Sequence, residues 1–441
     1  MYDSLNKYEK IVFSFLAVFL VLFYAGSAVW IPAATEYHRG VYVLITYILV
    51  LMIYKSKHPV FRVFDYLLMV IAAVTVIYWI ANFEAITYRA GAETEIDQMV
   101  AIFGVLLGIE IARRAVGTVF VIIGVVLLLY GVYGQYMPDL IAHPGDSFSG
   151  VCTTIFFKED GVFGIMANVL ATYVLLFVLF GAFLEQSGAQ KFFIDFPMAT
   201  VGHKTGGPAK VAVIASAMFG SISGSAIANT VSTGAFTIPL MKKAGFRPHI
   251  AGAIEPAASI GGMFMPPIMG AGGFIMAELT GVSYSWIMLV AIFPALMYFF
   301  SVFVMVHFEA KYHNIRGIKS EQSGWQIFKK EWYYITPLLI ITIFMLVGYS
   351  AGFAAVLGIV SCVVVSWFKK DTRIGINEFI NAARMGTEAS LKIGATVGII
   401  GIIIAMLTYS GLILTFADIV IELAAGSLPL TILYIALASL V

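Results

Sequence analysis

About a dozen apolar stretches in this sequence are long enough, or nearly long enough, to cross a lipid bilayer. These stretches constrain the fold most, because backbone amides in hydrocarbon must find their hydrogen-bond partners within helices or a closed barrel. The short alternating segments of a membrane β-barrel are absent. We therefore predict an all-α, polytopic helical membrane protein. The stretches lie at approximately 11–30, 40–54, 66–83, 98–112, 115–134, 162–184, 250–277, 283–308, 333–349, 351–368, 393–416 and 427–441.

The composition excludes several classes of function. Hydrophobic residues make up 61% of the chain and charged residues only 12%, so a lipid bilayer must be the solvent for most of it. The net charge of +1 comes without any Lys/Arg-rich run, which excludes a nucleic-acid partner. Cys152 and Cys362 lack the spacing of a disulfide framework or a zinc site. The sequence contains no HExxH motif or Ser/His constellation, so we expect neither an enzyme nor a bound cofactor.

The basic residues predict an orientation in the bilayer, because Lys and Arg gather in cytoplasmic loops. Basic residues before the first apolar stretch and after the second share one side, while the acidic segment 84–97 falls on the other. The N-terminus is therefore predicted to be cytoplasmic. The basic segments 191–210 and 242–247 both fall inside, so the stretch 211–240 must leave and return on one side. We expect a re-entrant hairpin there.

The predicted hairpin carries small and hydroxyl side chains at 219–234, where a lipid-facing helix would carry Leu or Phe. Gly224 permits a turn at membrane depth. Backbone carbonyls at the turn, with the hydroxyls of Ser223 and Ser225, would offer an all-oxygen shell to a hard cation such as Na⁺. The alternative is a small-residue face on which helices pack closely.

A second irregular stretch follows at 257–273. Pro266 and Pro267 remove two amide donors, and Gly261 and Gly262 loosen the preceding turn, so a continuous helix is not expected. Irregular backbone at membrane depth is tolerated only where it lines an enclosed or wet cavity. A hairpin tip beside a broken helix is typical of a transporter site, with half-helix N-termini for an anionic substrate and carbonyls for a cation.

Several motifs occur in order over about 160–310, and together they resemble the TRAP transporters (tripartite ATP-independent periplasmic transporters), more narrowly the fused permeases of the TAXI type. Weaker likeness extends from about 97 to the end. This resemblance implies Na⁺-coupled import (symport) of an organic anion across the inner membrane by an elevator mechanism. It also implies a partner, a periplasmic solute-binding protein of the TAXI type. The matching stretches are Gly206–Lys210, Ser223–Asn229, Thr237–Lys242, Ala251–Glu255, Met265–Gly270 and Ala277–Glu278.

The family's functional positions can be carried over onto this sequence. The first of two Na⁺ sites would be formed by Ser223, Ser225, Gly261, Gly262, Met265 and Pro266. The substrate would lie near Ser225, Asn229, Thr230 and Gly262.

The resemblance also implies a domain organisation. Residues 1–114 would form a small-subunit-like four-helix scaffold, 115–134 a linker transmembrane helix, and 135–441 a large-subunit-like transport region. The family's large subunit is an inverted repeat whose second half carries another hairpin and broken helix. The present sequence stops at Val441 within an apolar run, without a second Pro-Pro break, so we expect a truncated chain with one half of the binding site.

Glu255 offers an alternative coupling mechanism. It precedes Pro256 within an apolar stretch, and carboxylates inside the membrane often mark proton pathways, so proton coupling through Glu255 is the alternative to Na⁺. The structural interpretation is a helix-end carboxylate near the cytoplasmic face, close to Arg247 and His249. A channel is less well supported, because the sequence contains no repeated selectivity-filter motif.

Overall fold

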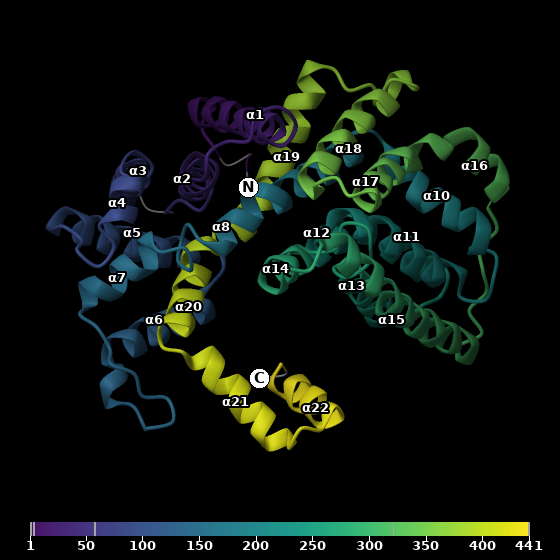
Figure 1. Ribbon diagram of the computed structural model, residues 1–441. Helices are drawn as coiled ribbons and strands as arrows, with labels where there is room; N and C mark the ends of the chain where they lie inside the picture. The colour runs from purple at the N-terminus through teal and green to yellow at the C-terminus, as the bar shows by residue number, and fades with distance from the viewer. Residues whose placement is uncertain (1, 3–4, 57–58, 321, 440–441) are drawn as a thin grey trace. The chain divides into compact units, whose positions relative to one another are not determined.

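A computed structural model of the chain describes residues 2, 5–56, 59–320 and 322–439. Every regular element within these ranges is helical, which confirms the all-α prediction (Figure 1). Eight of the helices are long and apolar enough to cross a membrane. The chain forms two compact units, one built from residues 34–168 and from 391 onward, and the other from Tyr2–Ala33 and Val169–Ser390.

The first unit is a bundle whose helices meet through glycines. A Cβ atom on Gly398 would lie 2.7 Å from the Cα of Gly108, so α5 (Glu95–Ala115) and α20 (Val397–Tyr409) cross with their backbones nearly in contact. The helices are α2 (Thr35–Ile53), α3 (Pro59–Ala81), α4 (Phe83–Tyr88), α5 (Glu95–Ala115), α6 (Thr118–Tyr133), η2 (Gly134–Tyr136), α7 (Phe148–Phe157), α8 (Ile165–Val169), α20 (Val397–Tyr409), α21 (Leu412–Ala424) and α22 (Leu428–Ala438).

One predicted span in this unit is wrong in its extent. The apolar stretch 393–416 was expected to cross as a single run, but α20 ends at Tyr409 and α21 begins at Leu412. Gly411 between them has a φ of +71°, a left-handed conformation that ends a helix and that glycine adopts without strain. Hydropathy alone does not register such a break, because the flanking residues are equally apolar.

The second unit contains the predicted hairpin and the broken helix. Its helices are α1 (Lys7–Val29), the π-helical turn η3 (Leu170–Val174), α9 (Leu175–Gln186), α10 (Ala189–Val201), α11 (Gly207–Ser223), α12 (Ala226–Lys243), α13 (Pro248–Gly261), α14 (Ala271–Thr280), α15 (Tyr284–Tyr312), α16 (Gly324–Glu331), η4 (Trp332–Ile335), α17 (Thr336–Val347), α18 (Ala351–Ser366), η5 (Lys370–Thr372) and the larger part of α19 (Ile376–Gly394).

The core of the second unit packs small side chains against large ones. Helices α11 and α13 contribute alanines such as Ala212 and Ala258, whereas α15 contributes Phe299, Val302 and Val306. Small residues let the backbones of α11 and α13 approach closely, and the bulky residues of α15 fill the remaining space. This packing fixes the hairpin α11–α12 against α13, as Figure 1 shows.

Candidate functional site

The hairpin turn forms at the predicted residues. Helix α11 ends at Ser223, and Gly224 follows with a φ of +57°, in the left-handed region that favours glycine. Ser225 then caps α12, because its hydroxyl oxygen accepts the Ala228 amide at 3.3 Å. A Cβ atom on Gly224 would lie 2.1 Å from the carbonyl oxygen of Met269, so the close approach of the broken helix also requires glycine here.

The broken helix is interrupted from 262 to 270, between the end of α13 at Gly261 and the start of α14 at Ala271. The interruption is held by hydrogen bonds from both sides. The Ile268 amide donates to the Ser221 carbonyl of the hairpin at 3.2 Å. The Tyr284 hydroxyl donates to the carbonyls of Pro267, at 3.1 Å, and Ile268. The irregular backbone is therefore a fixed structure within this unit.

Four helix ends meet around this interruption, in two like pairs. The C-termini of α11 and α13 approach so closely that a Cβ on Gly220 would lie 2.5 Å from the Cα of Gly262. The starts of α12 and α14 are adjacent because a Cβ on Gly270 would lie 3.0 Å from the Gly224 carbonyl oxygen. C-termini carry unpaired carbonyls and partial negative charge, which suit a cation, whereas N-termini suit an anion.

The structure separates the predicted ion-site residues into two environments. Ser223, Ser225 and Gly262 lie at the meeting of helix ends. Gly261, by contrast, packs against α15, because a Cβ there would lie 2.6 Å from the Phe299 ring. Met265 is partly buried against the apolar core. Pro266 lies within the interruption and is half-buried.

The predicted substrate residues on α12 are engaged within the protein. Asn229 is fully buried, and its amide nitrogen donates to the Ser216 carbonyl at 2.9 Å. The Thr230 hydroxyl donates to the carbonyl of Ala226 in its own helix at 2.8 Å. Within the described residues, no group of three or more His, Cys, Asp or Glu side chains could hold a metal ion.

Glu255 is enclosed by hydroxyl groups, and its interpretation as a helix-end carboxylate is wrong. It is 0% exposed in the middle of α13, and its carboxyl group accepts from Ser216 at 2.7 Å and from Ser259 at 3.3 Å. The hydroxyls of Thr233 and Thr237 also donate to it. We call these four hydroxyl residues and Glu255 the hydroxyl cage.

The basic neighbour proposed from sequence for Glu255 has a different partner. The Arg247 guanidinium donates to the Glu309 carboxylate of α15 at 3.0 Å, an ion pair at the start of α13. One turn of helix rises about 5.4 Å, so Glu255, two turns further along α13, is out of reach of that pair. The hydrogen-bond partners of the Glu255 carboxyl group are therefore the hydroxyls of the cage.

The hydroxyl cage can satisfy both protonation states of Glu255. When the carboxyl group is ionised, the surrounding hydroxyls can all donate to it. When it is protonated, Thr233 can instead donate to the Asn229 carbonyl at 2.8 Å and Thr237 to the Thr233 carbonyl at 3.1 Å.

Sequence reasoning singled out Glu255 but missed the four hydroxyl residues of this cage, although a signal was present. Asn229, Thr233 and Thr237 recur at intervals of four residues on α12, and Ser259 follows Glu255 by four on α13. Residues four apart share a helix face. A polar stripe on one helix and an acid on the next would have predicted the contact.

These helices and this interrupted backbone define a polytopic helical membrane protein with a hairpin and a broken helix side by side. A family profile described as "Tripartite ATP-independent periplasmic transporter, DctM component" matches residues 103–441, so the chain belongs to that family.

Three relatives illustrate the match. A putative TRAP transporter large permease protein of Haemophilus influenzae is 27% identical over 275 residues, covering 61% of this chain and 59% of its own. The C4-dicarboxylate TRAP transporter large permease protein DctM of Pseudomonas aeruginosa is 27% identical over 243 residues, covering 51% and 55%. The sialic acid TRAP transporter large permease protein SiaM of Vibrio cholerae is 29% identical over 159 residues, covering 36% and 37%. The match thus spans about half the length of the first two relatives.

Proposed function

We propose that this chain takes part in Na⁺-coupled import of an organic anion across the inner membrane, with a periplasmic solute-binding protein of the TAXI type delivering the substrate. The observation that carries the proposal is the meeting of like helix ends in the second unit. Two C-termini concentrate carbonyl oxygens for a cation, and two N-termini beside them favour an anion. A symporter that carries a cation together with an anion needs two adjacent sites, one that prefers the cation and one that prefers the anion.

The proposed Na⁺ ligands are neutral oxygens from Ser223, Ser225, Gly261, Gly262, Met265 and Pro266. Within this set, Gly262 has the strongest structural support, because its backbone lies against Gly220 at the end of α11. Na⁺ is a hard cation, and carbonyl and hydroxyl oxygens can replace its hydration shell without a carboxylate.

The proposed substrate site consists of Ser225, Asn229, Thr230 and Gly262, beside the N-termini of α12 and α14. The printed names of two relatives specify a C4-dicarboxylate and sialic acid, both carboxylic acids. A carboxylate is the anion that paired helix N-termini would bind. An organic carboxylate is therefore the substrate class we propose.

The proposed arrangement in the membrane follows from the charge pattern. The N-terminus is cytoplasmic, and the α11–α12 hairpin enters and leaves the bilayer on the cytoplasmic side. Residues 1–114 form the small-subunit-like scaffold, 115–134 the linker helix, and 135–441 the transport region of a fused permease. Transport proceeds by an elevator movement of the hairpin and broken helix against the scaffold.

Proton coupling through Glu255 is the second candidate, and the hydroxyl cage is the observation that favours it. A buried carboxyl group that keeps its hydrogen bonds in both protonation states could take up and release a proton without rearrangement. In this alternative, Glu255 carries the coupling proton, and the helix ends still bind the anion.

Uptake into proteoliposomes distinguishes the two coupling ions. The permease is reconstituted with and without its binding protein, under an inward Na⁺ gradient or an inward proton gradient, as wild type, Ser225→Ala and Pro266→Ala. Na⁺ coupling predicts uptake that needs both Na⁺ and the binding protein, with an altered Na⁺ dependence in both variants. Uptake that ignores Na⁺ and follows the pH gradient would refute Na⁺ coupling and favour Glu255.

A further inference from the structure

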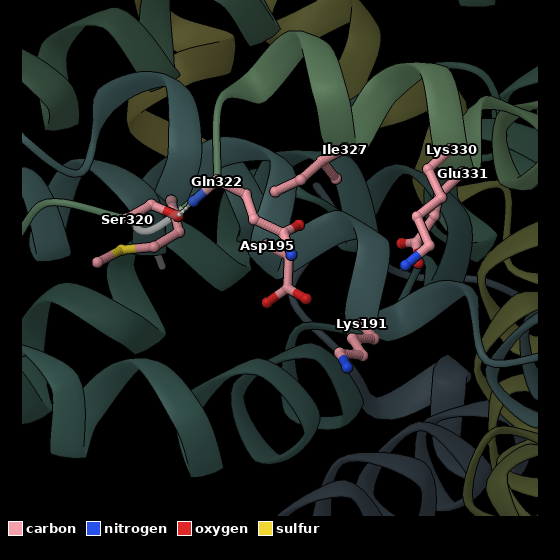
Figure 2. Close-up of a pocket in the computed structure, with 8 residues that line it drawn as sticks. Lys191, Asp195, Ser320, Gln322, Ile327, Lys330 and Glu331 are labelled. Atoms are coloured by element: carbon pink, nitrogen blue, oxygen red, sulfur yellow. Dashed lines mark hydrogen bonds between the residues drawn. The ribbon is translucent and has the colours of Figure 1, made fainter.

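A polar pocket of about 340 Å³ lies between α10 and α16 in the second unit (Figure 2). The proposed transport function does not use it. The Asp195 carboxylate projects into the middle of the pocket, with Lys191 and Lys330 to one side. Its lining consists of Lys191, Asp195, Met198, Ser320, Gln322, Ile327, Lys330 and Glu331.

The pocket presents both signs of charge. Among the ion pairs of the described residues, none involves Lys191, Asp195 or Lys330. Glu331, in contrast, is paired with Lys369 at 2.6 Å. Burial raises the pKa of Asp195 above its ordinary value, and Lys191 and Lys369 only partly oppose this effect. An acid and two ammonium groups thus face the pocket without direct partners of their own.

Exposed tryptophans place the pocket at the level of lipid headgroups. Trp325 on α16, Trp332 in η4 and Trp367 at the end of α18 are 63%, 55% and 55% exposed. The Lys329 ammonium lies 5.3 Å from the centre of the Trp325 ring. Exposed tryptophans and lysines at helix ends mark the boundary between hydrocarbon and water in membrane proteins. The positive-inside pattern assigns this boundary to the cytoplasmic leaflet.

An apolar cavity of about 500 Å³ shares helix α10 with the polar pocket and is otherwise lined mainly by α11 and α15. Phe193 of α10, Ile335 at the end of η4 and Leu338 of α17 line it, together with Phe300 and Phe303 of α15. Almost all of its lining is hydrocarbon, so an acyl chain would fill it at little cost. A charged pocket and an apolar cavity that both border α10 match the two parts of a phospholipid.

We propose that the α10–α16 pocket binds the headgroup of a phospholipid that carries a primary amine, as phosphatidylethanolamine does. Asp195 accepts hydrogen bonds from the lipid ammonium group, and Lys191 and Lys330 contact its phosphate. A purely anionic headgroup would place negative charge against Asp195. A choline headgroup would offer Asp195 no N–H donor.

The test compares lipids that differ only in the headgroup. Short-chain phosphatidylethanolamine, phosphatidylcholine and phosphatidylglycerol are titrated into the detergent-solubilised permease, and binding is followed by native mass spectrometry. The wild type should prefer the ethanolamine lipid about tenfold over both others. Asp195→Asn should abolish this preference. The double variant Lys191→Gln with Lys330→Gln should weaken the binding of all three lipids. Lys243→Gln, on the exposed end of α12, is the matched control and should change nothing.

Three outcomes would overturn the proposal. Equal binding of the ethanolamine and choline lipids by the wild type would show that Asp195 does not recognise the ammonium group of the lipid. An unchanged preference in Asp195→Asn, with the fold verified by thermal melting, would place the site elsewhere. Soluble glycerophosphoethanolamine binding as tightly as the lipid would show that the apolar cavity contributes nothing.

Discussion

The close crossing of α11 and α13 at Gly220 and Gly262 makes Gly262→Ala an informative single perturbation. Gly262 has a φ of −63° and a ψ of −24°, which alanine adopts freely, so any cost arises from contact alone. Its new Cβ atom would lie 2.4 Å from the Cα and 2.9 Å from the carbonyl carbon of Gly220. Both are backbone atoms, so no flexible side chain can move aside.

The expected magnitude follows from this distance. Ordinary contact begins at 3.4 Å, so α11 and α13 must separate by about 1 Å. Overpacking of this kind costs about 1–3 kcal/mol. A shift of that size also exceeds the roughly 0.5 Å within which binding groups must be held. We therefore expect the half-saturating Na⁺ concentration for uptake to rise about tenfold or more, which corresponds to about 1.4 kcal/mol of lost binding.

The matched control lies on the same helix. A Cβ atom on Gly252 of α13 would meet nothing within 4 Å, so Gly252→Ala should stabilise the helix by about 0.5–1 kcal/mol and leave Na⁺ dependence unchanged. Both variants are compared by thermal melting and by uptake at varied Na⁺. Wild-type stability and Na⁺ dependence in Gly262→Ala would refute the close crossing of α11 and α13.

Three further predictions concern single side chains. Burial alone raises the pKa of Asp97, but hydrogen bonds from Arg89 and its neighbours outweigh burial and hold the pKa below its ordinary value. The ionised carboxylate therefore stabilises the folded protein above about pH 4, and this stabilisation is lost in stronger acid. Asp97→Asn should remove the stabilisation, lowering the stability by about 1 kcal/mol in thermal melts. Tyr284→Phe keeps the ring stacked 4.1 Å from Phe274 but loses the hydroxyl that donates to the broken helix, and should raise the half-saturating Na⁺ concentration without changing expression. Glu255→Gln leaves hydroxyl donors facing an amide nitrogen, so the substitution should destabilise the protein by about 1–3 kcal/mol. A loss of uptake that is confined to proton-driven conditions would favour proton coupling.

The features that sequence predicted well are local. Gly224 requires a turn because of its own backbone freedom, and Gly261–Gly262 with Pro266–Pro267 cannot continue a helix whatever surrounds them. The hairpin and the interruption therefore appear where their residue chemistry placed them. The long apolar runs likewise became helices because each satisfies its own backbone.

The features that sequence missed depend on how helices rotate against one another. The hydroxyl cage joins side chains of α11, α12 and α13. The spacing of four marks the polar faces of α12 and α13, but the position of Ser216 on α11 beside Glu255 is set only when the three helices pack. Gly261 remains a proposed ion ligand, and its small size also permits a contact with Phe299 of α15 that the sequence pattern does not show. The Asp195 pocket needs α10 and α16, which are more than a hundred residues apart in sequence.

Binding of radioactive sodium to the purified permease tests the proposed Na⁺ site by itself, because the measurement needs neither substrate nor binding protein. Wild type, Ser225→Ala, Gly262→Ala and the control Gly252→Ala are compared across Na⁺ concentrations at fixed ionic strength. We expect saturable binding that is weakened about tenfold or more in the first two variants and unchanged in the control. Saturable binding that is identical in all four proteins would contradict a Na⁺ site at the meeting of the helix ends.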